Sequence, residues 1–107
     1  MEVFGLSQKI LKAICDVFAA NRKIHRVAIF GSRALGKHRL GSDIDLALEG
    51  NGLTLDDILT IRLRLDDLML PYRFDVVNLA DLSQTDPLRD HIKNSGKVIF
   101  QRKTNVH

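Results

Sequence analysis

The stretch FGSRALGKHRLGSDIDLAL, residues 30–48, decides the fold of this chain and contains most of its candidate chemistry. It follows directly on RVAIF, 26–30, a short apolar run that predicts a buried strand. It leads into DIDLALE, 43–49, where apolar residues recur at every second position, as they do in a half-buried strand. Two aspartates, Asp43 and Asp45, stand in this second strand, where side chains are expected to pack.

The other periodic segments predict helices and strands around this stretch. Apolar residues at helical spacing predict helices over 6–20 and 54–70, the second ended by Pro71, and a short helix is expected after Gly31. Asp86 with Pro87 is typical of a helix start and Gly96 of a helix end. Further strands are expected at 74–79 and 97–101. This alternation predicts an α/β (α+β) fold, with a mixed β-sheet of about four strands covered by helices.

Composition sets the class of protein. With 107 residues, 45% of them hydrophobic, the chain fits one soluble domain spanning 1–107. No apolar run approaches the roughly 20 residues that cross a bilayer, and no signal peptide is recognisable, so we expect a cytoplasmic protein without membrane contact. Cys15 is the only cysteine, which excludes an internal disulfide and favours a buried small side chain. The net charge of +3 suits a polyphosphate ligand, whereas the scattered basic residues make nucleic acid an unlikely partner.

The aspartate pair suggests a metal site. Side chains two positions apart share one face of a strand, so Asp43 and Asp45 lie side by side. Two uncompensated carboxylates repel each other and raise the pKa of at least one of them. A divalent cation such as Mg²⁺, which takes carboxylate and phosphate oxygens, would relieve that repulsion. The alternative is a solvent-facing strand end beside a turn.

Two further features suggest a phosphate site next to these carboxylates. Gly31 permits a close backbone approach, and free amides at the start of a helix, with the Ser32 hydroxyl, bind anions. An ordinary helix cap explains Ser32 equally well. Asp75 falls early in the strand 74–79, where it could lie beside the aspartate pair or be an exposed strand-end charge.

Together these residues resemble the nucleotidyltransferase superfamily of DNA polymerase β and kanamycin nucleotidyltransferase, whose signature is G-S-x-A-x-G, then S-D-x-D and a later aspartate. The matching positions are Gly31-Ser32-Arg33-Ala34-Leu35-Gly36, Ser42-Asp43-Ile44-Asp45 and Asp75. The short chain is similar to the minimal nucleotidyltransferases, which are often paired with a helical HEPN-domain protein. One position departs from the pattern, because many minimal members have arginine where this chain has Leu35.

The resemblance implies a nucleotidyltransferase fold and a two-metal mechanism. The β- and γ-phosphates of ATP or another nucleoside triphosphate would lie on Gly31 and Ser32, with Arg33, Lys37 and Ser42 as further nucleotide-binding residues. Asp43 and Asp45 would hold two Mg²⁺ ions, and Asp75 would ligate the catalytic ion and help to deprotonate the acceptor. An acceptor hydroxyl would attack the α-phosphorus and release pyrophosphate.

The same resemblance leaves two functions open. The first is an enzyme that transfers AMP from ATP to a hydroxyl on a partner protein, with tyrosine as the leading acceptor. The second is a nucleotide-binding but catalytically weak antitoxin or regulatory subunit of a HEPN-type partner. A third interpretation, from the residues alone, is a structural domain with an accidental acidic pair.

The sequence gives less support for a functional role of the remaining basic residues and histidines. Lys37, His38 and Arg39 could steer phosphate or form a solvated basic loop, and the spacing of His38 matches no metal site. No role is expected for the other histidines, which are His25, His91 and His107.

The helix expected at 54–70 carries two apolar stripes, which is more than one core requires. The members of the first are Ile58, Ile61, Leu65, Leu68 and Met69, and those of the second are Leu55, Leu59, Leu63 and Leu70. One stripe could therefore remain exposed and bind a helical partner protein or a second copy of the chain. The alternative is a helix lodged between the sheet and another helix, which would bury both stripes.

Overall fold

The predicted alternation of helices and strands is confirmed except for the short helix expected after Gly31. The computed structural model describes residues 2–39 and 41–102; His107, for which no role is expected, lies outside them. In chain order the elements are β1 (Glu2–Val3), β2 (Leu6–Ser7), α1 (Gln8–Ala19), β3 (Ile24–Phe30), β4 (Ile44–Gly50), α2 (Leu55–Asp66), β5 (Phe74–Asn78), the 3₁₀ turn η1 (Leu79–Asp81), α3 (Pro87–Ser95) and β6 (Lys97–Gln101).

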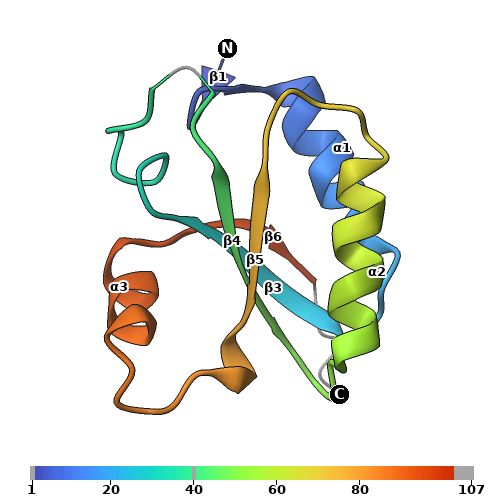
Figure 1. The fold of residues 1–107 in the computed structure, drawn as a ribbon, viewed down its shortest axis with the longest axis vertical. Coiled ribbons are helices and arrows are strands. Elements are labelled where there is room, and N and C mark those ends of the chain that lie inside the picture. Colours follow the sequence, from blue (N-terminus) through green and yellow to red (C-terminus); the bar gives the residue numbers. More distant parts are fainter. Residues whose placement is uncertain (1, 40, 103–107) are drawn as a thin grey trace.

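Four strands form one mixed sheet in the order β5-β4-β3-β6 (Figure 1). The central strand β3 pairs antiparallel with β4 on one side and with β6 on the other. β4 pairs parallel with β5, and α2 makes the crossover that a parallel connection requires. β5 is therefore an edge strand, and the predicted mixed α+β sheet is confirmed.

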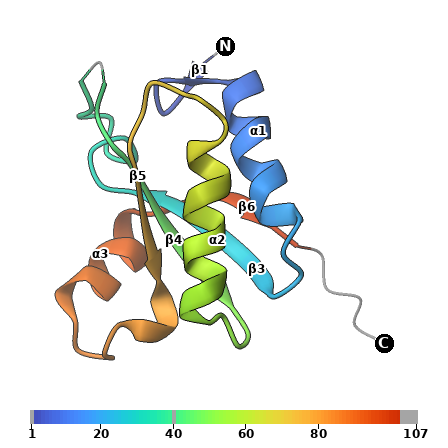
Figure 2. The same ribbon diagram turned by 45° about the vertical axis from the view of Figure 1, so that its right-hand side comes forward.

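The two faces of the sheet are covered unequally. Figure 2 shows α1 and α2 together on one face and α3 alone on the other. The face under α1 and α2 holds most of the core, with the fully buried side chains Leu6, Ile14, Phe18, Ile24, Val27, Ile29, Ile44, Leu46, Leu48, Ile61 and Leu65. Each such aliphatic side chain contributes roughly 1.5–3 kcal/mol through burial, so this face supplies most of the stability.

The face under α3 has a smaller core. Phe30, Ala47 and Ile92 are buried there, and four partly buried side chains pack around them, namely Val77, Leu79, Leu82 and Leu88. The alternation along β4 explains the division, because Leu46 joins the large core while Ala47 joins the small one. The upper part of this second face, at the start of β4 and β5, carries carboxylates instead of apolar residues.

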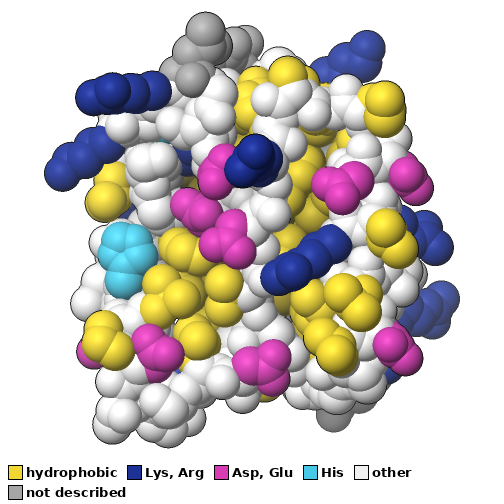
Figure 3. Space-filling model, viewed as in Figure 1, with side chains coloured by type: hydrophobic (Ala, Val, Ile, Leu, Met, Phe, Trp, Pro, Cys, Tyr) yellow, Lys and Arg dark blue, Asp and Glu magenta, His cyan; other side chains and the backbone are white. Residues whose placement is uncertain are grey.

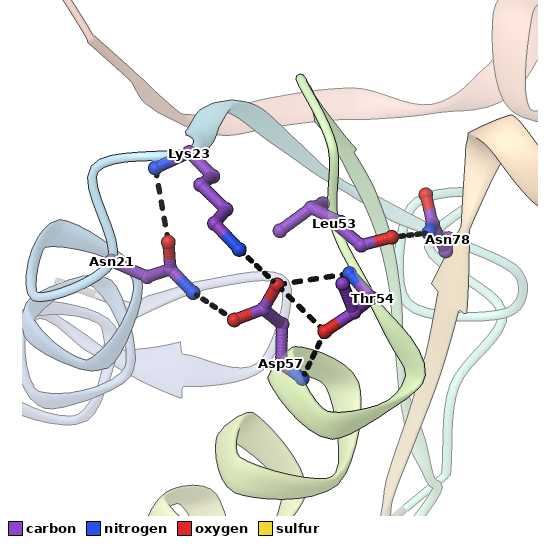
Figure 4. A network of polar contacts seen from close by, with 6 residues as sticks. All are labelled: Asn21, Lys23, Leu53, Thr54, Asp57 and Asn78. Carbon is purple, nitrogen blue, oxygen red and sulfur yellow. Dashed lines mark hydrogen bonds and ion pairs between the residues drawn. The ribbon is translucent and has the colours of Figure 1, made fainter.

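A polar network fixes the start of α2 (Figure 4). Thr54 and Asp57 form a capping box: the Asp57 amide donates to Thr54 Oγ1 (3.1 Å) and the Thr54 amide donates to Asp57 Oδ2 (2.9 Å). Lys23 Nζ, just before β3, donates to the same carboxylate at 2.9 Å, and Asn21 Nδ2 donates to its other oxygen at 3.4 Å. The network ties α2 to the chain that enters β3, and so holds α2 over the large core.

Several local expectations were wrong at their boundaries. A two-residue hairpin, β1 with β2, precedes the first helix, so α1 begins at Gln8 after the cap Ser7, whose hydroxyl accepts from the Ile10 amide (3.2 Å). Residues 31–36 form turns instead of the expected short helix.

The second long helix also ends earlier than its apolar pattern predicts. α2 stops at Asp66, and the chain leaves it through Met69, which has a positive φ of 56°. The apolar period therefore continues past the last helical turn, which the sequence pattern alone does not reveal. Among the residues that the structure describes, no helix combines the length and apolar character needed to span a membrane.

Candidate active site

The sheet register brings the predicted carboxylates together. In the parallel pair of β4 and β5, Asp45 lies directly opposite Asp75. Asp43 stands one residue before β4, two positions from Asp45 on the same side of the chain. Figure 3 shows acidic side chains gathered over the starts of these two strands. Asp75 therefore lies beside the aspartate pair, and it is at the same time exposed near the start of β5.

The crowding of these groups changes the acidity of the central one. Partial burial is the largest cause that raises the pKa of Asp45 above its usual value, and the negative charges of Asp75 and then Asp43 raise it further. The charge of His91 acts in the opposite direction. Asp45 is thus a carboxylate that its protein neighbours do not fully compensate, which is the property expected of a cation ligand.

Gly31 lies directly against this carboxylate. Its φ is +74°, a conformation that side-chain-bearing residues rarely adopt. A Cβ at this position would collide with Oδ2 of Asp45. Glycine is therefore required twice over, by the backbone conformation and by the close approach of the turn to the carboxylate.

The turn after Gly31 folds back on itself through two backbone hydrogen bonds. The Leu35 amide donates to the Gly31 carbonyl (3.2 Å), and the Lys37 amide donates to the Ser32 carbonyl (2.8 Å). Ser32 follows the contact between Gly31 and Asp45 and is half-buried, whereas Leu35 and Lys37 are exposed. Any phosphate on this turn would lie next to Asp45.

Arg33 has a position that the motif alone does not reveal. Its side chain is only 3% exposed, Nη1 donates to the Phe4 carbonyl (2.8 Å), and Nε and Nη2 donate to the Ser42 carbonyl (3.2 and 2.9 Å). The guanidinium also lies 4.9 Å from the centre of the Tyr72 ring. A buried cation needs such partners. In this position Arg33 links the N-terminal hairpin and the turn after β3 to the residue that precedes Asp43.

Ser42 and His38 belong to the same framework. The Ser42 hydroxyl accepts from the Arg39 amide (2.8 Å), which closes the loop ahead of Asp43. His38 packs against the turn at Gly5, where a Cβ would collide with the imidazole Nε2. Lys37 and Arg39 remain exposed on this loop. The structure therefore places Ser42, Arg33 and His38 in contacts within the protein and leaves Lys37 free to face a ligand.

The donor set fits Mg²⁺, although the carboxylates form no closed cage. Within the described parts of the chain, no three His, Cys, Asp or Glu side chains converge on a point that could hold a metal ion. Mg²⁺ is commonly held by one or two carboxylates together with substrate phosphates and water. Asp45, which lies against Gly31, would offer such an open set of oxygen ligands together with Asp43 and Asp75.

His91 is the residue near this site that sequence reasoning missed. It lies on α3 and makes an edge-to-face contact with Phe30, with ring centres 6.2 Å apart and planes at 81°. Phe30 is the residue before Gly31, so the imidazole stands beside the start of the phosphate turn. No spacing in the sequence signals this position, because it depends on how α3 packs across the sheet.

A cavity of about 530 Å³ opens elsewhere on the α3 face and does not include these carboxylates. Several of its charged groups already have partners within the protein: Arg26 pairs with Glu49 (3.4 Å), and Arg89 donates to backbone carbonyls of Leu79, Leu82 and Ser83. The candidate active site is therefore an open surface at the strand starts and not this cavity.

Comparison with known proteins agrees with the geometry. The family model described as "Polymerase beta, Nucleotidyltransferase" matches residues 12–105. No curated protein sequence matches the chain.

Solved structures with a similar fold include several toxin–antitoxin complexes. A toxin–antitoxin complex with AMP-PNP matches with a TM-score of 0.72 and 22% identity, over 87% of this chain and 74% of the other. The MntA–HepT toxin–antitoxin complex matches with a TM-score of 0.68 and 20% identity, over 90% of this chain and 74% of the other. The complex of tri-AMPylated Shewanella oneidensis HEPN toxin with MNT antitoxin matches with a TM-score of 0.67 and 20% identity, over 89% of this chain and 72% of the other. At such identities the similarity is one of fold.

Proposed function

Because the chain belongs to the polymerase beta nucleotidyltransferase family, as its two motifs predicted, we propose that it transfers a nucleoside monophosphate from a nucleoside triphosphate to an acceptor hydroxyl. One observation carries the proposal: Asp45 lies opposite Asp75 in the sheet and against Gly31 of the turn. The backbone proposed to bind phosphate therefore lies next to the uncompensated carboxylates. Residues 1–107 would form the single domain that carries this site.

The donor binds through its phosphates. The turn at Gly31 and Ser32 receives the β- and γ-phosphates, and exposed Lys37 adds positive charge from the same loop. Arg33 and Ser42, expected from the resemblance to bind the nucleotide, would contribute indirectly, because Arg33 donates to the Ser42 carbonyl and so holds the turn beside Asp43. Two Mg²⁺ ions, held by Asp43, Asp45 and Asp75 with the phosphates, would supply charge neutralisation at the attacking and leaving oxygens.

The reaction is an in-line displacement at the α-phosphorus. The acceptor oxygen forms a bond to the α-phosphorus while the bond to the bridging oxygen of the β-phosphate breaks, and pyrophosphate leaves. The acceptor proton passes to Asp75, which lies on the edge strand and is exposed to an incoming hydroxyl. The phosphate turn and Asp75 flank Asp45 on opposite sides, as attack opposite to the leaving group requires.

ATP is the proposed donor, and a tyrosine hydroxyl of a helical HEPN-type protein is the proposed acceptor. The fold relatives named above support this choice, since one complex contains AMP-PNP and another a tri-AMPylated HEPN toxin. The chain itself supplies a docking surface, because Leu55, Leu59 and Leu63 of α2 are 72%, 46% and 65% exposed. These leucines form the outer stripe of α2, and a helical partner would cover it.

A second candidate function has one observation in its favour. Leu35 stands 46% exposed at a position where many minimal members have arginine, and the guanidinium of Arg33 is occupied by backbone carbonyls. A phosphate turn with little positive charge favours a nucleotide-binding but catalytically weak regulatory subunit of the same partner. Both functions use the same site, so turnover separates them.

The test is a transfer assay with α-labelled ATP, Mg²⁺ and whatever protein co-purifies with the chain. We expect label on the partner and one pyrophosphate released per label. Binding of ATP without transfer would favour the regulatory subunit, and binding of no nucleotide at all would refute both functions. Inorganic pyrophosphatase should accelerate net transfer, which distinguishes nucleotidyl transfer from the attachment of a phosphate group.

A further inference from the structure

An apolar surface adjoins the carboxylates on the α3 face of the sheet. It consists of Val77 of β5, two positions beyond Asp75 on the same face of that strand, and Leu88 of α3, packed around buried Phe30. In Figure 3 hydrophobic side chains and one histidine lie next to the acidic group over the starts of β4 and β5. Apolar surface beside a polar reaction centre is typical of a site that receives part of a substrate.

His91 forms the α3 boundary of this surface. Its ring is held edge-to-face by Phe30 at 6.2 Å and remains half-buried, so part of the imidazole is accessible. Two links place it at the reaction centre through Phe30, which precedes Gly31 in the chain and lies opposite Asp45 in the sheet. The ring therefore stands where a group attached to the α-phosphate would pass.

We propose that His91, together with Phe30, Val77 and Leu88, forms a subsite for the nucleobase of the donor, with the imidazole stacking on the base. The inference rests on the proposed function, because it needs the triphosphate on the turn at Gly31. The order of groups in the donor supports it. Phosphates on the turn bring the α-phosphate to Asp45, and the ribose and base continue from there along the α3 face. There the half-buried His91, Val77 and Leu88 offer aromatic and apolar surface, supported from below by buried Phe30.

Stacking needs a planar ring and not a particular charge, and this makes the proposal specific. Base–aromatic stacking changes affinity by about tenfold or more for each ring and tolerates different bases. The subsite should accordingly bind ATP and GTP with similar strength, while inorganic tripolyphosphate, which has no base, gains nothing from it. His91→Phe should retain the stacking surface, whereas His91→Ala should remove it.

The experiment measures Mg²⁺-dependent binding of ATP and of tripolyphosphate to the full chain, with His91→Ala, His91→Phe and Lys93→Ala. Lys93 is an exposed residue of the same helix that lines the cavity away from the carboxylates, so its variant controls for changes in α3. We expect His91→Ala to lose about tenfold in ATP affinity with tripolyphosphate binding unchanged. His91→Phe and Lys93→Ala should bind both ligands like the natural chain.

Three results would overturn the subsite. Equal loss of ATP and tripolyphosphate affinity in His91→Ala would mean that the imidazole acts on the phosphates or on the fold. Unchanged ATP affinity with loss of transfer would assign the ring to the acceptor. If the natural chain binds tripolyphosphate as tightly as ATP, the base has no subsite although the donor site stands. Failure to bind either ligand refutes the proposed function itself, and the subsite with it. Thermal unfolding of each variant identifies any that do not fold.

Discussion

Two aspartates in this molecule, Asp57 and Asp45, face opposite electrostatic surroundings. Asp57, at the start of α2, is held by Lys23, by both donors of Thr54 and by Asn21, and hydrogen bonding to Lys23 is the largest cause that lowers its pKa to about 2. Among residues 2–39 and 41–102, no comparable set of donors holds Asp45, and partial burial and two neighbouring carboxylates raise its pKa.

The difference separates an acidic residue whose charge stabilises the fold from one whose charge the protein leaves uncompensated. A carboxylate with a lowered pKa releases free energy when the chain folds, while one with a raised pKa costs stability above its folded pKa. Selection for stability alone would remove the second kind. The region around Asp57 is compensated by its own donors, whereas the charge around Asp45 is what the proposed Mg²⁺ ions would neutralise.

The largest expected effect comes from removing the negative charges of Asp43 and Asp45. We expect Mg²⁺ with ATP to raise the Tm of the natural chain by at least about 10 °C at about 100 times the Kd, since only the folded state binds. Asp43→Asn with Asp45→Asn should abolish that rise and all transfer. The double variant should unfold no more easily than the natural chain without ligand, because the repulsion is gone. Thermal unfolding with and without ligand checks both points, and an undiminished rise in the double variant would contradict the assignment.

Substitution of Asp75, in the same region, should affect the transfer reaction much more than nucleotide binding. If it serves the acceptor proton and the catalytic ion, Asp75→Asn should lower transfer by at least about 100-fold while leaving much of the triphosphate affinity. Transfer rates and nucleotide titrations on the same sample measure the two effects. Equal loss of both would place Asp75 among the principal ligands of the nucleotide-bound metal.

The helix that Asp57 anchors has its own incomplete surface, and a pair of substitutions tests it. Leu59→Glu or Leu63→Glu on the outer stripe should change the free energy of unfolding by no more than about 0.5 kcal/mol, because these side chains are 46% and 65% exposed. Either should weaken association with the partner, or of two copies, by about tenfold or more. The matched control is Ile61→Glu, which places a charge at a 2% exposed position and should unfold the chain. Size measurements report the association and unfolding curves report the stability of each variant. If Leu59→Glu and Leu63→Glu both associate like the natural chain, α2 is not part of the interface.

The smallest expected effect is a pH-dependent contribution of Asp57 to the stability of the fold. The folded pKa of Asp57 lies below the unfolded value near 3.8, so its contribution is full above about pH 4 and is lost as pH falls toward about 2. Asp57→Asn should therefore be less stable than the natural chain at pH 6, with the gap closing toward pH 2. Denaturant unfolding across this range provides the measurement. A gap independent of pH would show that the capping geometry, and not the ionised carboxylate, stabilises α2.

Local patterns in the sequence predicted what depends on neighbouring residues. The alternation in 43–49 identified β4, and Asp86 with Pro87 identified the start of α3. The two motifs identified the family, because Gly31 and the aspartates are each demanded by their own local chemistry. The 3.6-residue period also predicted the two apolar stripes of α2, but two assignments were wrong because the helix ends at Asp66: Met69, of the first stripe, is 87% exposed, and Leu70, of the second, packs against the large core.

Tertiary structure decided everything that depends on which segments meet. The register that sets Asp45 opposite Asp75 comes from a parallel crossover through α2, which no local pattern encodes. The same holds for Arg33, whose guanidinium reaches a carbonyl 29 residues away in the N-terminal hairpin, and for His91, which the packing of α3 brings to Phe30. Exposure of Leu59 and Leu63 was settled only when the sheet and α1 covered the other side of α2. Periodicity states that a face is apolar, whereas long-range packing decides what covers it.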